Sequence, residues 1–432
     1  MSDTLFPSPA FLNNAVIYEV NIRQYSPEGT FNAFAAHLPR LKELGAGILW
    51  LMPIHPIGVE KRKGTLGSYY SISDHKGINP EFGNADDLRS LVTNAHARGI
   101  KIIIDWVANH TAWDHVWTKT HPDFFVRNDK GDFTAPYDWD DVIQIDHSNS
   151  GEQAAMQDAM QYWIEEFDID GFRADLAHLT PLQFWKDARL KLTSLKKDLV
   201  WLAETEGPGY HEAFDISYTW EWMHATEKFS KKEISLGDCI GVLKKYKTDF
   251  PAQAHRLFFT SNHDENSWNG TEFEKYGALA KPWAVFSFTY PGLPLIYSGQ
   301  ELPNRKRLKF FDKDLIEWNG DIQLQDFYKI LSELRKRNKT IAAGAATELH
   351  FFEEFADKNI LAYQLSAGEA GLLVFLNMGT EDVSQHIFSE SIKGRFRDVF
   401  SGEEAELKNE YLFSAKGGEF KVLEKIVPTD LH

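Results

Sequence analysis

The chain has 432 residues, of which 43% are hydrophobic and 25% are charged. This length fits a (β/α)8 barrel with an additional module, and this composition is typical of a globular protein with a sizeable core rather than of a disordered chain. The formal net charge of −17 disfavours nucleic acid as a partner, because the overall field repels polyanions. The single cysteine, Cys239, excludes a disulfide within the chain.

The first twenty residues, MSDTLFPSPAFLNNAVIYEV, lack a basic segment followed by an apolar one. No run of 18 apolar residues occurs anywhere in the sequence, so no transmembrane helix and no membrane partner are expected. A cytoplasmic protein is the simplest interpretation. A secreted chain whose signal peptide has been removed is the alternative.

Short apolar runs rich in β-branched residues alternate with segments of helical periodicity, which favours βα units and a parallel sheet. Eight runs are predicted strands, at 15–20, 46–51, 100–105, 170–175, 199–204, 214–218, 256–262 and 294–299. Eight strands separated by helices indicate an α/β protein with a closed (β/α)8 barrel, or TIM barrel, rather than an open sheet.

Two of the intervening segments carry clear helix signals. FNAFAAHLPRLKELG predicts one helix that ends at Gly45, and NADDLRSLVTNAHARG predicts a helix with Asn84 as its N-cap and Gly99 at its end. Two connections from strand to helix, residues 52–83 and 106–149, are much longer than the others. Long loops at the carboxyl ends of barrel strands usually carry the function, so both are expected to shape a cleft.

After a helix predicted near 324–339, the pattern changes to short alternating strands such as ILAYQL and GLLVFLNM. This predicts an antiparallel β-sandwich domain over residues 346–432. The expected domain organisation is a barrel of residues 1–105 and 150–345, an inserted domain of residues 106–149, and this C-terminal domain.

Polar motifs stand at the ends of predicted strands three, four, five and seven. They are DWVANH (105–110), GFRADLAH (171–178), LAETEG (202–207) and TSNHDEN (260–266). Because the carboxyl ends of barrel strands meet at one mouth, the four motifs are expected to converge despite their separation in sequence.

Within these motifs, Arg173 and Asp175 are two residues apart on a strand, so their side chains point the same way. The cation is expected to lower the pKa of Asp175 and keep it ionised, as a nucleophile requires. Glu204 follows an apolar run, where partial desolvation would raise its pKa toward that of a general acid. A pair of carboxylates in unlike environments is what glycoside hydrolysis uses, about 5–5.5 Å apart in retaining enzymes.

Each of these residues also has a structural interpretation. Taken singly, each Asp is more often a helix cap or an ion-pair partner, and each His is more often a satisfied core or loop residue. A metal hydrolase would need a His-x-His pair or a carboxylated Lys, whereas DWVANH offers only Asp105 and His110. The coincidence of four motifs at four strand ends favours a carbohydrate site over these separate explanations.

The four motifs closely resemble the conserved regions of the α-amylase family, glycoside hydrolase family 13. The resemblance implies a (β/α)8 barrel, a short domain inserted after strand three and a C-terminal antiparallel β domain. By position it makes Asp175 the nucleophile, Glu204 the acid/base and Asp264 the stabiliser of the transition state. The residues that it implies for substrate binding are Tyr70, Asp105, His110, Arg173, His178 and His263.

Two positions depart from the family pattern. His75 stands where family members usually have Tyr, and Gln144 stands where an Asp often helps to hold a structural calcium ion. Asn109 and the backbone of His178 match other usual calcium positions. Because calcium prefers carboxylates, a required metal is not predicted. A structural calcium ion is left as the alternative, and no other cofactor is expected.

The leading hypothesis is a retaining hydrolase that acts on α-1,4-linked maltooligosaccharides or starch fragments. The alternatives are an α-glucan transglycosylase and a hydrolase of another α-glucosidic linkage, such as an α-1,6 or α-glucosidase type. A further class is a non-catalytic relative, since the family includes transporter subunits that have lost catalytic residues; here all three carboxylates are present. Trp268 either touches a distal sugar or only packs.

Overall fold

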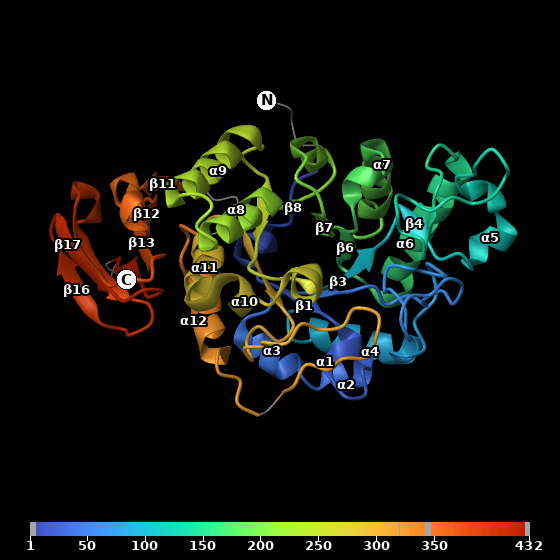
Figure 1. Ribbon diagram of the computed structural model, residues 1–432, viewed down its shortest axis with the longest axis horizontal. Helices are drawn as coiled ribbons and strands as arrows, with labels where there is room; N and C mark the ends of the chain where they lie inside the picture. Colours follow the sequence, from blue (N-terminus) through green and yellow to red (C-terminus); the bar gives the residue numbers. More distant parts are fainter. Residues whose placement is uncertain (1–5, 319, 342–346, 428–432) are drawn as a thin grey trace.

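The computed structural model describes residues 6–318, 320–341 and 347–427. Figure 1 shows a central α/β body, a small lobe formed by the inserted segment at one side and the C-terminal strands at the other. Among the described residues, no helix is long and apolar enough to cross a membrane.

Eight parallel strands form the closed barrel in the order β1-β10-β9-β8-β7-β6-β3-β2. The strands are β1 (Ile17–Val20), β2 (Ile48–Leu51), β3 (Lys101–Trp106), β6 (Gly171–Ala174), β7 (Val200–Ala203), β8 (Ile216–Tyr218), β9 (His255–Phe258) and β10 (Leu293–Tyr297). Each lies in one of the eight predicted runs or overlaps it closely. The predicted TIM barrel is therefore confirmed.

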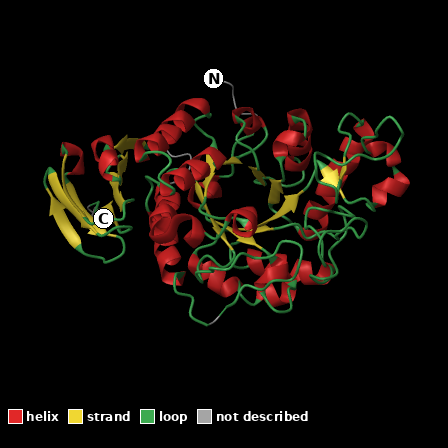
Figure 2. Ribbon diagram, viewed as in Figure 1, coloured by secondary structure: helices red, strands yellow, loops and turns green. Residues whose placement is uncertain are grey.

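Helices surround the barrel, as Figure 2 shows in red. Those of the barrel are α1 (Ile22–Tyr25), α2 (Phe31–Ala35), α3 (Leu38–Leu44), α4 (Ala85–His96), α6 (Ser150–Phe167), α7 (Leu182–Thr193), α8 (Trp220–Ser230), α9 (Leu236–Asp249), α10 (Glu272–Tyr276), α11 (Ala280–Thr289) and α12 (Gln325–Arg337). The Asn84 prediction is confirmed, because its side chain accepts hydrogen bonds from the first turn of α4 within a capping box.

The prediction of a single helix before Gly45 is wrong, although its end at Gly45 is confirmed. The segment forms two helices, α2 and α3, with His37 as the N-cap of α3 and Pro39 in its first turn. Proline has no backbone N–H to continue a preceding helix but is well accommodated at a helix start, which explains the break. Gly45 ends α3 in the left-handed conformation, at φ 106°.

Alternation along the strands divides the core into two layers. Ile17 belongs to the cluster inside the barrel together with residues such as Trp50, whereas Tyr18 and Val20 belong to the cluster between strands and helices. Because successive side chains of a strand point to opposite faces, Glu19 shares the inward face of β1 with Ile17. A carboxylate therefore lies inside the barrel.

The inserted segment contains a two-stranded antiparallel sheet of β4 (His110–Thr111) and β5 (Ile143–Gln144), and the helix α5 (Val116–Thr120). Beyond α12 the strands are antiparallel. They are β11 (Glu348–Phe351), β12 (Ile360–Ala367), β13 (Ala370–Asn377), β14 (Val383–Phe388), β15 (Gly394–Asp398), β16 (Glu404–Leu407), β17 (Glu410–Ala415) and β18 (Phe420–Lys425). They form a six-stranded sheet and the pair β14-β17, which enclose a core of their own. The domain boundary predicted at 345/346 lies outside the described residues.

Gly171 lets β6 approach β7 at the start of the strand. It has φ 148°, and a Cβ atom placed there would lie 2.1 Å from the carbonyl oxygen of Val200. We expect Gly171→Ala to lower the free energy of unfolding by more than about 2 kcal/mol, measured by urea denaturation. The matched control is Gly241→Ala in α9, where a Cβ would meet nothing within 4 Å; it should be neutral or stabilising by up to about 1 kcal/mol. Equal effects of the two substitutions would contradict the steric argument.

Candidate active site

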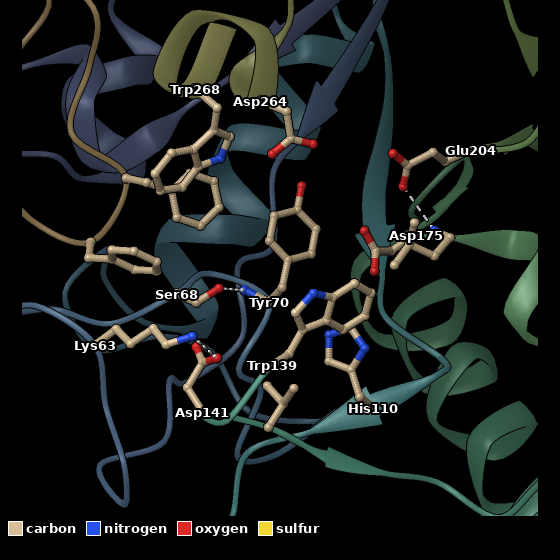
Figure 3. A pocket seen from close by; sticks show the side chains of 14 residues that line it. Lys63, Ser68, Tyr70, His110, Trp139, Asp141, Asp175, Glu204, Asp264 and Trp268 are labelled. Atoms are coloured by element: carbon tan, nitrogen blue, oxygen red, sulfur yellow. Dashed lines mark hydrogen bonds and ion pairs between the residues drawn. The ribbon is translucent and has the colours of Figure 1, made fainter. Parts of the chain in front are cut away.

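A pocket of about 310 Å³ lies at the mouth formed by the carboxyl ends of the strands (Figure 3). The loops that follow β2, β3, β6, β7, β9 and β10 line it. The lining residues are Lys63, Ser68, Tyr70, His110, Trp139, Asp141, Val142, Asp175, Leu176, Glu204, Asp264, Trp268, Phe310 and Phe311. This volume is at the low end of the range for small-molecule sites, about 300–1,000 Å³.

Arg173 on β6 lies at the floor of this pocket with a fully buried side chain. Its Nη1 is 3.0 Å from Oδ1 of Asp105 and 2.9 Å from Oδ1 of Asp175, and its Nη2 is 2.9 Å from Oε2 of Glu204. Its Nε donates to the hydroxyl of Tyr218 at 3.2 Å. One guanidinium therefore holds three carboxylates together. The contact between Arg173 and Asp175 confirms that their side chains point the same way, as their spacing predicts.

The two pocket carboxylates held by Arg173 are both removed from water. Burial raises the pKa of Glu204 to about 7 although Arg173 opposes the shift, and the backbone N–H of Leu176 donates to Glu204 Oε2 at 2.9 Å. Burial also raises the pKa of Asp175, to about 6. The predicted rise for Glu204 is confirmed. The predicted lowering for Asp175 is wrong, because desolvation outweighs the attraction of Arg173.

A chain of hydrogen bonds runs through the other side of the pocket. The Tyr70 hydroxyl donates to Oδ2 of Asp105 at 3.0 Å and lies 2.7 Å from Nε2 of His263. The same Nε2 is 3.3 Å from Oδ2 of Asp264, and Nδ1 of His263 is 2.5 Å from Oε1 of Glu19. His263 therefore connects Asp264, which lines the pocket, to the carboxylate of Glu19, which does not.

Aromatic side chains form the walls. The Tyr70 ring is nearly parallel to that of Phe310, with 6.2 Å between centroids, and Trp268 packs against Phe310 at 5.3 Å. His110 lies edge-on to Trp139 at 5.7 Å. Flat apolar faces beside carboxylates suit sugar rings, which present C–H groups on their faces and hydroxyls at their edges. Trp268 lines the pocket as well as packing against Phe310, and its contact with a distal sugar stays a prediction.

The structure brings together eight of the nine predicted site residues. Asp175, Glu204, Asp264, Tyr70 and His110 line the pocket, and Asp105, Arg173 and His263 contact them from beneath. His178 is exposed on the short turn η3 (Ala177–Leu179) and is not among the lining residues. The predicted role of His178 in substrate binding therefore stays a prediction, and it would involve a part of the barrel mouth outside this pocket.

Sequence reasoning missed several residues of the site. Glu19 carried a usable signal, since it is a charged residue within the apolar strand run AVIYEV. Phe310 and Phe311 belong to the loop after β10, and Trp139 and Lys63 to the two long loops. Nothing in the sequence separates such aromatic or basic residues from ones that only pack or face solvent.

An ion pair joins the two long loops at one end of the pocket. The Nζ of Lys63 is 2.8 Å from Oδ1 of Asp140 and 3.0 Å from Oδ1 of Asp141, and the Asp141 side chain is only 9% exposed. Figure 3 shows this pair on the far side of Tyr70 from Glu204.

His75 does not reach the pocket. It is buried, its Nε2 lies 2.9 Å from the carbonyl oxygen of Val107, and its Nδ1 lies 3.0 Å from Nε2 of His115. The departure from the family's Tyr at this position therefore affects how the loops pack against each other rather than the pocket lining.

The calcium positions of the family are poorly matched. The Asn109 amide lies 3.3 Å from Nδ1 of His110, and position 144 carries a neutral Gln whose backbone is paired within the inserted segment. In the part of the chain that the structure describes, no group of three or more His, Cys, Asp or Glu side chains is arranged to hold a metal ion. Ca²⁺ also binds backbone and amide carbonyl oxygens, so the expectation that no calcium ion is required stays a prediction.

Comparison with known proteins agrees with this architecture. The family defined by the α-amylase catalytic domain matches residues 13–146 and 138–343. The structure superposes on that of AmyB, a maltogenic α-amylase of Thermotoga neapolitana, with a TM-score of 0.88 and 31% identity over 96% of this chain and 99% of that one. The intracellular maltogenic amylase of Bacillus subtilis is 26% identical over 93% of this chain and 70% of its own length.

The α-amylase MalA of Haloarcula japonica is 26% identical over 87% of this chain, and the match spans 57% of MalA. The matched family covers the whole barrel and both sides of the inserted segment. The family match thus agrees with the barrel and the inserted segment, and the superposition on AmyB extends over 96% of this chain. The chain belongs to the α-amylase family of glycoside hydrolases.

Proposed function

We propose that the protein is a retaining α-glycoside hydrolase that acts on α-1,4-linked maltooligosaccharides or starch fragments. The observation that carries the proposal is the contact of one buried guanidinium with both Asp175 and Glu204, each at 2.9 Å. Because both carboxylates contact Arg173, they lie close together in the same pocket, and a retaining mechanism requires two carboxylates that are close together.

In the proposed reaction, Asp175 attacks the anomeric carbon while the bond from that carbon to the glycosidic oxygen breaks. The bonding electrons go to the leaving oxygen, and Glu204 delivers its proton there. In the second half, Glu204 removes a proton from water, the hydroxide attacks the anomeric carbon, and the bond to Asp175 breaks. The positive charge that develops on the sugar ring is stabilised by Asp264.

The remaining predicted residues bind and orient the sugar in this proposal. Tyr70 presents its ring to the sugar, and its hydroxyl is fixed by Asp105 and His263. His110 donates a hydrogen bond to a sugar hydroxyl group, His263 contributes through its contacts with Tyr70 and Asp264, and Arg173 holds the carboxylates in place. The names of the relatives support an α-glucan substrate, since MalA and AmyB are both called α-amylases.

The proposal is tested by incubating the protein with maltooligosaccharides, pullulan, dextran and sucrose and separating the products. We expect maltooligosaccharides to be shortened, at the same rate with and without EDTA, because we propose that no calcium is needed. Asp175→Asn should lower kcat by about 10³-fold or more while substrate binding survives. Added acceptor sugar tests the transglycosylase alternative, in which a second sugar replaces water.

The control for Asp175→Asn is Asp215→Asn, which alters another buried Asp–Arg pair, 2.7 Å from Arg189 and away from the pocket. It should keep turnover. Absence of turnover on every α-glucoside would refute the proposed function, and cleavage of pullulan or dextran alone would refute the assigned linkage.

The pKa shifts predict a narrow pH profile. Asp175 must be ionised to attack, so activity falls as pH drops through its pKa of about 6. Glu204 must be protonated to act as the acid, so activity falls as pH rises through its pKa of about 7. The profile of kcat/KM should therefore be bell-shaped with its maximum between these values. A rate that keeps rising between pH 7 and 9 would contradict the assignment of Glu204.

The position of the ion pair at Lys63 leads us to propose that the products are short. Glu204 protonates the leaving oxygen and so marks the acceptor side, and Lys63 with Asp141 lies on the opposite side of Tyr70 (Figure 3). A bridge between the two loops there limits how many sugar units fit on the donor side.

We expect Lys63→Ala to shift the products released from starch toward longer maltooligosaccharides, as seen by chromatography. Lys76→Ala is the matched control, since Lys76 forms an exposed ion pair with Asp158 at 2.6 Å and does not line the pocket. An unchanged product distribution for Lys63→Ala would show that this bridge does not limit chain length.

A further inference from the structure

Glu19 is an unusual residue for the interior of a barrel. It lies on the inward face of β1 with no exposed surface. Its Oε1 is 2.5 Å from Nδ1 of His263, and its Oε2 has no hydrogen-bond partner among the residues that the structure describes. Burying a carboxylate is costly unless it is paired, so an apolar side chain would suit this strand better if packing alone mattered.

The hydrogen bonds around His263 fix where its protons lie. The hydroxyl of Tyr70 has one hydrogen, which it donates to the carboxylate of Asp105 at 3.0 Å. Its oxygen is therefore the acceptor in the 2.7 Å contact with Nε2 of His263, so Nε2 carries a hydrogen. Nδ1 lies 2.5 Å from Oε1 of Glu19, and an ionised Glu19 accepts a hydrogen from it. With Glu19 ionised, His263 is therefore an imidazolium.

The charges that face this imidazolium come from several strands. The ionisable residues near His263 or its partner Glu19 are Tyr70, Asp105, Arg173, Tyr218, Asp264 and Tyr297. Burial alone would lower the pKa of His263, but the carboxylates of Asp264 and Glu19 raise it well above the usual value. In turn, His263 overcomes the effect of burial on Asp264 and lowers the pKa of that carboxyl group.

We propose that Glu19 is a positioning residue for the reaction, which holds His263 as an imidazolium aimed through Nε2 at Tyr70 and Asp264. The proposal rests on the function proposed above, in which Asp264 stabilises the developing charge of the sugar. Without Glu19, the imidazole can lose its proton or rotate. Asp264 then lacks its fixed partner, and the Tyr70 hydroxyl loses its donor.

The test compares Glu19→Gln with Glu301→Gln. Glu301 is a matched control because it is also fully buried, accepts a hydrogen bond from Tyr18 at 2.6 Å and pairs with Arg40 at 2.9 Å, but does not line the pocket. For Glu19→Gln we expect kcat to fall at least about 10-fold with little change in KM. Glu301→Gln should keep kcat even if its melting temperature falls.

Histidine NMR of the folded protein provides a readout that a purely structural role would not change. In the wild-type protein the ring signals of His263, assigned with a His263→Gln variant, should stay those of an imidazolium at pH values well above the ordinary histidine pKa. In Glu19→Gln the ring should titrate at lower pH, toward the ordinary pKa of about 6.5, because one carboxylate is lost. Glu301→Gln should leave the His263 titration unchanged.

A neutral His263 at pH 7 in the wild-type protein would overturn the proposal, even if Glu19→Gln failed to fold. An unchanged His263 titration in folded Glu19→Gln would overturn it too, as would equal losses of kcat in the two variants. Failure of the proposed function would give a different result from failure of this proposal. The wild-type protein would then turn over no α-glucoside, while His263 could still titrate as described.

Discussion

The positive charge of Arg173 lies in the mouth of the barrel with no exposed surface, and three carboxylates share it within 3.0 Å. Charges removed from water in this way are stable only when their partners are in place. Asp105, Asp175 and Glu204 come from three different strand ends, so the closed barrel is what brings them to one guanidinium. The pocket depends on this interaction, since without the cation the carboxylates would repel one another.

The same burial raises the pKa of both carboxylates that flank the cleaved bond. Desolvation brings the pKa of Asp175 to about 6 and that of Glu204 to about 7, although both touch Arg173. The pKa of Asp264 is lowered instead, because the neighbouring His263 overcomes the effect of burial. The mouth therefore combines one ionised carboxylate with a pair of carboxylates near neutrality, and one proton shared by that pair leaves one member as acid and the other as nucleophile.

Much of the fold could be predicted because buried parallel strands read as short apolar runs, and all eight strands were found in this way. The convergence of Asp175, Glu204 and Asp264 follows from the same topology. Local sequence did not predict the break between α2 and α3, where Pro39 was read as interior to one helix. It could not predict the net pKa shift of Asp175, because the degree of burial of this side chain depends on parts of the chain that are distant in sequence.

The central claim is that Asp175 forms a covalent intermediate that is resolved on the same face from which the leaving group departed. Proton NMR of a maltooligosaccharide digest, recorded before the products mutarotate, tests this most directly. A retaining reaction releases the new reducing end as the α anomer, because two displacements at the anomeric carbon restore its configuration. Release of the β anomer would mean a single displacement by water and would contradict a nucleophilic role for Asp175.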